Sequence, residues 1–342
     1  MFHIMRRRMT LTVALAATVT LLAACSSGAS GSGSSGSAGA SGGAKHLRIG
    51  AMYLDSQGYY GGVRAGVKKA ADASGVKVDI VESTSAGDVS KENSFMSSLI
   101  ASGVNAIIMS AVSTDGSVAA VKQAHDAGIP VICYNTCVND DAVKQYVSAY
   151  ILGDPVKFGQ MMGDFAGKYF TDQKVADPKI GVINCEQYEV CQQRMQGFKD
   201  ALTKAVPGAT IAADQQGTES DTAISVGEQI LTSHPDVTGM YGQSGGATVG
   251  AFKSISNRGK DGQIAAFGSD MTTDIATALK AGTVLKGVVD ISGIEVGKLA
   301  FAAAQDAIAG KKLDDKVIQA PIKLYTPADA QAWLDSHPDG LP

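Results

Sequence analysis

The chain has 342 residues, of which 45% are hydrophobic and 18% charged, and its formal charge is −4. This length is enough for a large hydrophobic core and for two domains. The acidic balance, with no stripe of Lys or Arg along the chain, argues against nucleic acid as a partner.

The first 24 residues are typical of an export signal. Arg6 to Arg8 precede an uncharged run from Met9 to Ala24, which is long enough for the core of a signal peptide and short for a stable membrane span. The run ends in Leu22-Ala23-Ala24-Cys25, which resembles the bacterial lipobox, in which the cysteine is acylated and becomes the first residue. We therefore expect a signal peptide at 1–24 and lipidation at Cys25. The alternative is an ordinary secretory cleavage site beside an incidental cysteine.

A segment of small residues follows the cysteine. From Ser26 to Ala44 the chain contains only Ser, Gly and Ala. Because such residues have no large apolar side chains to bury, we expect a flexible coil with a root-mean-square reach of about 25 Å. Residues 25–45 thus predict a lipidated cysteine and a tether. They would hold the exported, folded part of the protein at the outer face of the cytoplasmic membrane through the lipid anchor alone.

Beyond the tether, short apolar runs alternate with segments of helical period. In Ser90 to Gly103, for example, Phe95, Met96, Leu99 and Ile100 form one apolar face of a helix. The βαβ alternation predicts an α/β fold, with parallel sheets covered by helices on both faces. The runs predicted to be buried strands are 48–54, 76–81, 105–110, 130–135, 179–184, 237–242 and 263–268.

Ligands of such folds collect at the carboxyl ends of the strands, so the residues that follow the strands are candidates for function. Polar groups and a pair of aromatic rings gather at these positions, and no cluster of histidines does. No metal ion or other cofactor is therefore expected. The candidates at strand ends are Asp55, Ser56, Gln57, Tyr59, Tyr60, Asn135, Thr136, Cys137, Gln243, Ser244 and Asp270.

Several stretches of the body carry a resemblance to a known family. In chain order they are Gly58 to Gly66, Ala127 to Ile132, Arg194 to Phe198, Leu231 to Val237 and Phe267 to Asp270. The order and spacing of these stretches resemble those of the type I periplasmic binding proteins, above all the ribose-type sugar-binding members that serve ABC transporters.

The resemblance implies two Rossmann-like lobes with parallel sheets, joined by a three-crossing hinge. The crossings are expected near Ala149, Asp290 and Pro321. The implied N-terminal lobe comprises 46–150 plus 291–320, and the implied C-terminal lobe comprises 151–290 plus 321–342.

The resemblance also implies where a ligand binds. Aromatic rings stack on the C–H faces of sugars, carboxylates accept hydrogen bonds, and a guanidinium donates two at once. The expected ligand is therefore a small sugar or polyol. Arg194 takes the place of the family's ligand-binding arginine, although a solvated helix charge is its alternative role, and Asp270 could instead cap a helix. The implied ligand-binding residues are Gln57, Tyr59, Tyr60, Asn135, Thr136, Arg194, Ser244, Asp270 and Asp290.

The implied function is that of a monomeric, extracytoplasmic solute-binding lipoprotein and not of an enzyme. It would capture the sugar or polyol by hinge closure and deliver it to the permease of an ABC transporter. LacI-type repressors share the fold, but they carry a helix-turn-helix where this chain has a signal and a tether. A lipoprotein that reports its ligand to a membrane receptor remains an alternative.

A second alternative comes from Gly242 to Gly246, which reads G-x-S-x-G between a strand and a helix, as in a hydrolase nucleophile elbow. Ser244, Asp270 and His337 follow one another in the chain order of an α/β-hydrolase-type esterase. No HGGG-type oxyanion stretch occurs upstream, so the pattern favours a hydroxyl that binds a ligand.

Four cysteines follow Cys25, and outside the cytoplasm an even count predicts disulfides. Cys185 with Cys191 is the preferred pair because it closes a short loop. Cys133 with Cys137 is a second pair, although Cys133 could instead be buried as a small apolar residue. A four-thiolate zinc site would need closer C-x2-C pairs, so no metal is expected.

Overall fold

The computed structural model describes residues 46–56 and 58–342. The predicted signal peptide at 1–24, the lipidation site Cys25, the tether at 25–45 and the candidate ligand residue Gln57 lie outside the described residues. In the described part of the chain, no helix has the length and apolarity that crossing a membrane requires.

The first lobe is built on a six-stranded sheet in the order β11-β5-β4-β3-β1-β2, and every neighbouring pair is parallel. Its inner strands are runs of buried apolar residues, among them Ile107 and Ile108, because helices cover both faces of a parallel sheet. Its strands are β1 (Leu47–Tyr53), β2 (Val78–Thr84), β3 (Ala106–Met109), β4 (Val131–Tyr134), β5 (Ala149–Leu152) and β11 (Val317–Gln319). Its helices are α1 (Gly58–Ala73), α2 (Val89–Ala101), α3 (Val118–Asp126), α4 (Asp140–Tyr146) and α10 (Gly293–Ile308).

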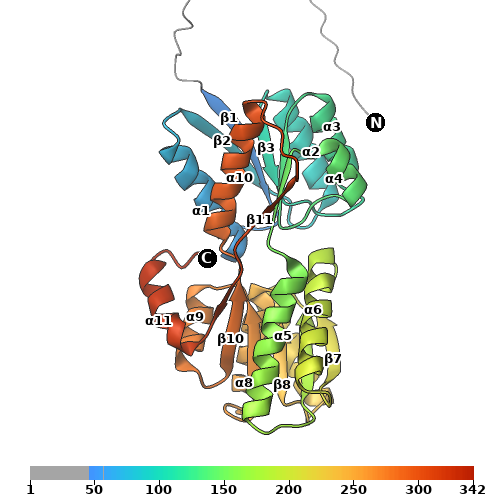
Figure 1. Cartoon of the computed structure of the whole chain (residues 1–342), viewed down its shortest axis with the longest axis vertical. Coiled ribbons are helices and arrows are strands. Elements are labelled where there is room, and N and C mark those ends of the chain that lie inside the picture. The colour runs from blue at the N-terminus through green and yellow to red at the C-terminus, as the bar shows by residue number, and fades with distance from the viewer. Residues whose placement is uncertain (1–45, 57) are drawn as a thin grey trace, which may run out of the picture. The chain divides into compact units, whose positions relative to one another are not determined.

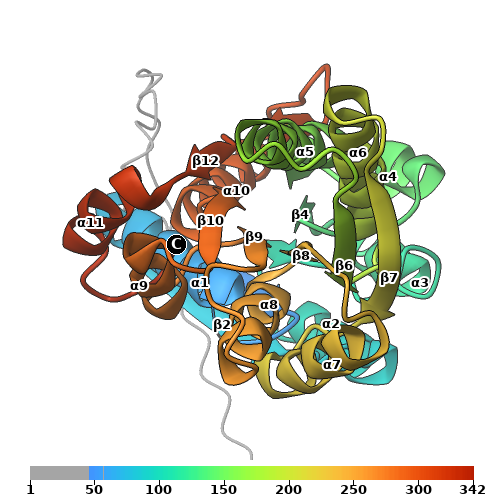
Figure 2. The same cartoon turned by 90° about the horizontal axis from the view of Figure 1, so that it is seen from below.

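The second lobe repeats this plan in the order β12-β10-β9-β8-β6-β7, with β12 alone antiparallel to its neighbour. Figure 2 shows α5 and α6 on one face of this sheet and α7 and α8 on the other. Its strands are β6 (Lys179–Asn184), β7 (Thr210–Gln216), β8 (Gly239–Gly242), β9 (Ala265–Ser269), β10 (Leu285–Asp290) and β12 (Lys323–Tyr325). Its helices are α5 (Pro155–Asp172), α6 (Glu189–Ala205), α7 (Ser220–Ser233), α8 (Gly245–Asn257), α9 (Thr273–Ala281) and α11 (Pro327–Ser336).

The chain passes between the two sheets three times (Figure 1), between β5 and α5, between β10 and α10, and between β11 and β12. The predicted α/β fold with two lobes and mainly parallel sheets is confirmed. The predicted boundary after Tyr150 falls inside β5, which continues to Leu152.

Two pairs of helices pack backbone against backbone at glycines. In the first lobe, a Cβ atom on Gly66 of α1 would lie 2.1 Å from the carbonyl oxygen of Ile294 in α10. In the second lobe, a Cβ atom on Gly159 of α5 would lie 1.8 Å from the carbonyl oxygen of Arg194 in α6. Only glycine allows such an approach. Helices α10 and α5 each begin directly after a crossing. Two crossings therefore lead into helices whose backbones contact a neighbouring helix, α1 or α6.

The C-terminal residues contact both lobes. Helix α11 packs on α9, and Trp333, 2% exposed, lies in the core of the second lobe. Beyond α11 a main-chain oxygen of Pro342 accepts a hydrogen bond, 2.8 Å long, from the N–H of Ile294 in the first lobe. The assignment of 321–342 to the C-terminal lobe alone is therefore wrong for the last residues, because the backbone returns to the start of α10.

Candidate ligand-binding site

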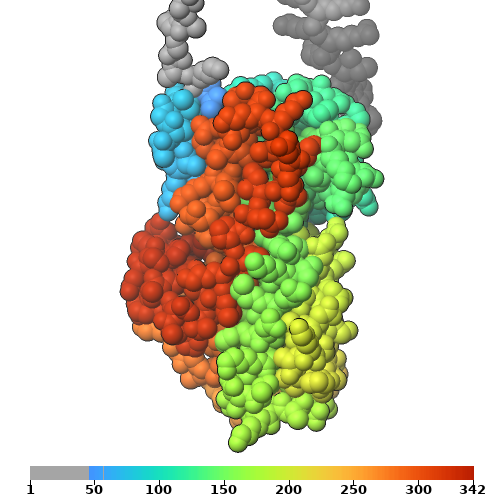
Figure 3. Space-filling view, viewed as in Figure 1, coloured from blue at the N-terminus to red at the C-terminus, as the bar shows by residue number. Residues whose placement is uncertain are grey.

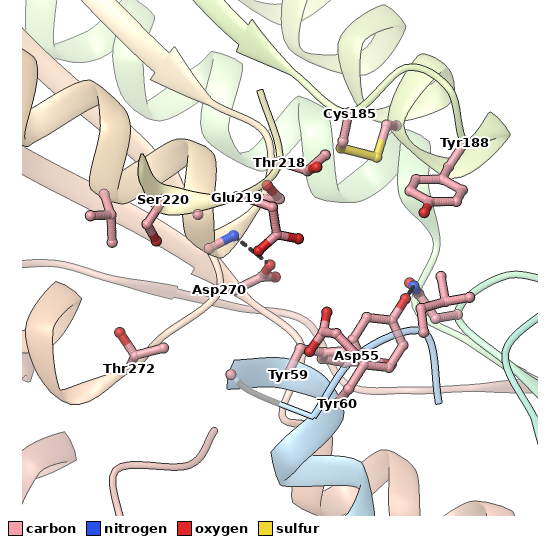
Figure 4. Close-up of a pocket in the computed structure, with 18 of the residues that line it drawn as sticks. Asp55, Tyr59, Tyr60, Cys185, Tyr188, Thr218, Glu219, Ser220, Asp270 and Thr272 are labelled. Carbon is pink, nitrogen blue, oxygen red and sulfur yellow. Dashed lines mark hydrogen bonds between the residues drawn. A yellow bond between two sulfur atoms is a disulfide. The ribbon is translucent and has the colours of Figure 1, made fainter. Parts of the chain in front are cut away.

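A cavity of about 680 Å³ lies at the carboxyl ends of strands from both sheets. Loops after β1, β2 and β4 form its wall in the first lobe, and loops after β6, β7, β8 and β9 form its wall in the second. Figure 4 shows Asp55, Tyr59 and Tyr60 on one side of the cavity, across from Tyr188 and Asp270. The volume lies in the range of about 300 to 1,000 Å³ that is typical of small-molecule sites.

Two tyrosine rings at the start of α1 line the first lobe's side of the cavity. The ring centres of Tyr59 and Tyr60 are 5.3 Å apart, with the rings edge to face. Burial raises the pKa of Tyr59 well above its ordinary value of 10.0, so its phenol stays neutral and can both donate and accept hydrogen bonds. The pair thus offers a ring face and hydroxyl groups to the same guest.

Asn135 follows β4 and lines the cavity with its backbone in the left-handed region, at φ +58°. Its Nδ2 donates to the hydroxyl of Tyr60 at 3.0 Å, and its carbonyl oxygen accepts from the hydroxyl of Tyr150 at 2.7 Å. Asn tolerates this backbone conformation better than most residues. The side-chain amide is therefore held in one orientation at the cavity wall.

Arg194 on α6 supplies the donor group. Its side chain is 7% exposed, and its guanidinium carbon lies 4.2 Å from the centre of the Phe158 ring. Nη1 donates to the carbonyl oxygen of Gln243 at 3.2 Å, whereas Nε has no hydrogen-bond partner among the described residues. An unpaired buried donor costs about 1–3 kcal/mol, so a ligand oxygen that reached it would be strongly favoured.

Gln243 holds this part of the wall together from behind. Its side-chain oxygen accepts from the N–H of Cys185 at 3.2 Å, and its Nε2 donates to Glu186 at 3.1 Å. Gln243 itself is completely buried and does not line the cavity. Together with its backbone bond to Arg194, these contacts fix the arginine relative to the loop after β6.

Asp270 supplies the acceptor group at the end of β9. Its Oδ2 accepts from the N–H of Gly245 at 2.9 Å, a bond that Figure 4 marks. Burial raises the pKa of this carboxyl group, while the charge of Arg194 and the Gly245 N–H oppose the increase. Since Arg194 and Asp270 both line the cavity, a guest with hydroxyl groups finds a donor and an acceptor there.

Ser244 lines the cavity and is the N-cap of α8, where its Oγ accepts from the N–H of Ala247 at 3.4 Å. His337 instead stacks on Trp333, with 4.4 Å between the ring centres, and its Nδ1 lies 2.8 Å from the carbonyl oxygen of Trp333. Among the described residues, no hydrogen bond joins His337 to Ser244 or Asp270. The esterase arrangement is thus not assembled, because a base must reach its serine directly.

Two of the predicted ligand residues lie behind the cavity wall. Thr136 is 8% exposed, and its hydroxyl bonds to Ser110 at 2.6 Å and to the carbonyl oxygen of Ala111 at 2.7 Å. Asp290 is 2% exposed and accepts from the N–H of Met271 at 2.8 Å. Neither lines the cavity. The expectation of direct ligand contact is corrected for both, since their polar atoms are used to support neighbouring loops.

Both cysteine pairs form disulfides. Cys185–Cys191 lines the cavity, and Cys133–Cys137 closes the loop that contains Asn135. The thiolates that a zinc site would need are consumed by these bonds. Within the described residues, no group of three or more His, Cys, Asp or Glu side chains is placed to hold a metal ion.

The cavity also has residues that the sequence did not single out as ligand residues. Tyr188 lies inside the Cys185–Cys191 loop. The predicted short disulfide was the only feature of the sequence that drew attention to this loop. A further group follows β7, a strand absent from the predicted set because its sequence is largely polar. The additional lining residues include Tyr188, Thr218, Glu219, Ser220, Thr272, Asp274 and Asp339.

The chain matches known proteins over most of its length. A family model described as a periplasmic binding protein domain matches residues 51–312. The chain is 53% identical over 299 residues to the ABC transporter periplasmic-binding protein YphF of Escherichia coli, covering 87% of this chain and 91% of that protein. It is 29% identical over 288 residues to the ribose import binding protein RbsB of Bacillus subtilis, covering 83% and 89%.

A solved structure supports the same fold. It is that of a Mycobacterium smegmatis protein in complex with β-D-fucofuranose, with a TM-score of 0.78 and 23% identity, and the match covers 86% of this chain and 95% of that chain. The lobes, the crossings and these matches agree, and the chain therefore belongs to the periplasmic binding protein family, as a type I member of the ribose type.

Proposed function

We propose that this protein captures a small sugar or polyol outside the cytoplasm and delivers it to the permease of an ABC transporter. The family consists of transport components, and the relatives named above are an ABC transporter binding protein and a ribose import protein. The observation that carries the proposal is the shared cavity, in which Tyr59 and Tyr60 of one lobe lie across from Arg194 and Asp270 of the other.

The proposed mechanism is closure of the two lobes around the guest. A ligand held by one lobe completes its hydrogen bonds only when the other lobe approaches, so the closed state is favoured by the contacts that exist only there. An analogue that lacks one hydroxyl would leave a desolvated group unpaired, at a cost of about 1–3 kcal/mol. Selectivity among sugars follows from that cost.

The test is a thermal-shift screen with D-ribose, D-allose, D-fucose, L-arabinose, myo-inositol and glycerol, followed by calorimetric titration. A ligand that binds only the folded state raises the melting temperature by mass action. We expect at least one compound to do so, and small-angle scattering should then show a more compact protein. If none of the six, nor a wider carbohydrate panel, shifts the transition, the proposed ligand class is wrong.

We further propose that the protein is a monomer and that Cys25 carries the lipid that holds it at the outer face of the membrane. The supporting observation is the sequence Leu22-Ala23-Ala24-Cys25 before a Ser/Gly segment. A single acyl chain binds membranes only weakly, whereas several chains on one cysteine give stable anchoring. Cys25→Ser should release the protein from the membrane fraction. A variant that stays membrane-bound would contradict this role.

Co-purification distinguishes transport from sensing. If an ABC-transporter permease is recovered with the ligand-loaded protein, transport is supported. Recovery of a membrane receptor instead would favour a sensor that uses the same cavity and the same closure.

A further inference from the structure

The residues that follow α11 form a bridge between the lobes beside the cavity. In Figure 1 the C-terminal mark lies at the junction of the two lobes, beneath α1 and α10. Figure 3 shows the dark red surface of the last elements on the lower lobe, reaching up to that junction. Asp339 and Gly340 line the cavity itself. This segment is separate from the three crossings. It begins in the second lobe, after α11, and ends against the first lobe.

On the second lobe, the bridge begins from a fixed base. The ring of His337 stacks on buried Trp333, and its carbonyl oxygen accepts from the N–H of Gly340 at 2.9 Å. Gly340 has a φ of +67°, and a Cβ atom there would lie 2.3 Å from the Oγ1 of Thr273 at the start of α9. Gly340 therefore turns the chain tightly against α9, and a larger residue would be both strained and crowded.

On the first lobe, the bridge ends on the first turns of two helices. Leu341 lies close to Gly61 of α1, where its Cδ2 would be 3.0 Å from an added Cβ atom. A main-chain oxygen of Pro342 accepts from the N–H of Ile294 at 2.8 Å. The N–H groups in the first turn of a helix have no partner within the helix, so Pro342 satisfies one open N–H group of α10 in addition to its N-cap, Ser292. Pro342 is itself buried.

The position of Asp339 follows from these two attachments. It lies between the turn at Gly340 and the end of α11, and among the described residues its carboxylate has no hydrogen bond or ion pair. A free carboxylate at a cavity wall can accept hydrogen bonds from two neighbouring hydroxyl groups. It also repels carboxylated analogues, since like charges at short range disfavour each other.

We propose that Asp339 is a specificity-determining residue of the ligand site, held in place by contacts of Gly340, Leu341 and Pro342 with both lobes. This inference rests on the proposed function, because it assigns Asp339 to the recognition of a hydroxyl-bearing, uncharged sugar or polyol. It adds to that function a fourth, non-covalent connection between the lobes.

The first arm of the test needs no ligand. Amide hydrogen exchange at Ile294 is compared between the wild-type protein, a variant lacking residues 339–342, and Gly340→Ala, which displaces the segment without deleting it. We expect exchange at Ile294 to be about tenfold faster in both variants, the effect of losing one hydrogen bond. Circular dichroism establishes that each variant is folded. Unchanged exchange in a folded variant would overturn the anchoring.

The second arm measures affinity for whichever of D-ribose, D-allose, D-fucose, L-arabinose, myo-inositol and glycerol binds the wild-type protein most tightly. We expect Asp339→Asn to weaken binding about tenfold. Asp335→Asn, which changes an exposed carboxylate of α11 away from the cavity, should leave it unchanged. Equal affinities for wild type and Asp339→Asn would overturn the role of Asp339. If neither these six compounds nor the wider carbohydrate panel binds the wild type, the proposed function fails and this role fails with it, while the exchange result still decides the anchoring.

Discussion

Asn135 and Asp270 occupy equivalent places in the two lobes. Asn135 directly follows β4, which lies between β5 and β3, and Asp270 directly follows β9, which lies between β10 and β8. Both have a left-handed backbone, at φ +58° and +61°, and both line the cavity. The repeated sheet plan therefore brings two polar side chains to the guest from corresponding strand ends, one as an amide and the other as a carboxylate.

The left-handed backbone of Asn135 leads to a stability prediction. Asn135→Gly removes the amide but keeps a residue that adopts this conformation freely, whereas Asn135→Ala removes the amide and adds backbone strain. We expect the alanine variant to be less stable than the glycine variant by about 1 kcal/mol in urea-induced unfolding. Equal free energies of unfolding would show that the backbone at this position is not strained.

The planar guanidinium geometry of Arg194, and not only its charge, should contribute to ligand affinity. Arg194→Lys keeps the charge but cannot bond to Gln243 and a ligand with the same planar geometry. We expect affinity for the best-binding sugar of the screen to fall roughly 10- to 100-fold in calorimetric titration. The matched control is Arg258→Lys, which changes an arginine that bonds to the carbonyl oxygen of Glu228 and does not line the cavity. Similar losses in both variants would argue against the assignment.

Asp290 should make stability depend on pH. Burial and the neighbouring charge of Asp270 raise the pKa of Asp290 from 3.8 to about 7, and the Met271 N–H opposes this. An acid with a raised pKa binds more protons in the folded state, so its stabilising contribution is full below about pH 4 and is lost as the pH rises to about 7.

Asp290→Asn tests this dependence because the amide oxygen can still accept from Met271 while the titration is gone. Between about pH 5 and pH 8, we expect the unfolding free energy of the wild type to fall by a few kcal/mol at most, and that of the variant to fall less. The exposed-site variant Asp335→Asn should follow the wild type. Parallel pH profiles for Asp290→Asn and the wild type would refute the prediction.

The Cys185–Cys191 disulfide should affect both stability and binding. Because it closes a short loop, replacing both cysteines with serine is expected to cost about 2 kcal/mol and to lower the melting temperature by a few degrees. The same bond lines the cavity and positions Tyr188, so sugar affinity should also decrease. A double variant with unchanged melting temperature and affinity would leave the bond without a role.

Ser244 should behave as a helix cap and a cavity residue, not as a nucleophile. Ser244→Ala removes the acceptor for the Ala247 N–H and should lower stability by about 1 kcal/mol. A fluorophosphonate probe should leave the wild-type protein unlabelled, since His337 is bonded to Trp333. Covalent labelling of Ser244 would revive the esterase alternative.

Much of the fold could be predicted because the inner strands are short apolar runs bounded by turns. The predicted run 130–135 ends one residue beyond β4, and the predicted run 263–268 ends one residue short of the end of β9. Both runs therefore placed Asn135 and Asp270 at strand ends, and both residues line the cavity. Strand β7 was missed because an edge strand is half exposed, and its sequence, Thr210–Gln216, is mostly polar. Because β7 was missed, the cavity residues that follow it, Thr218, Glu219 and Ser220, were missed as well.

Other parts of the site depend on tertiary contacts that leave no local pattern. Thr136 and Asn135 are adjacent in the chain, yet only the structure shows that the Thr136 hydroxyl is already bonded to Ser110 and Ala111. Likewise, nothing in the local sequence of Asp339 indicates that the chain returns across the cavity. That placement depends on Gly340 packing on Thr273 and on the open N–H of Ile294.

The glycine contacts between helices have a mechanical consequence. Helix α10 touches α1 at Gly66, and α1 carries Tyr59 and Tyr60, while α5 touches α6 at Gly159, directly beside the backbone of Arg194. Because these backbone contacts contain no side chain that could deform, each helix pair would move as a rigid body when its crossing rotates. Rotation at the hinge would thus directly displace the tyrosine rings and the Arg194 guanidinium. The opening of the cavity and the affinity for a ligand would therefore change together.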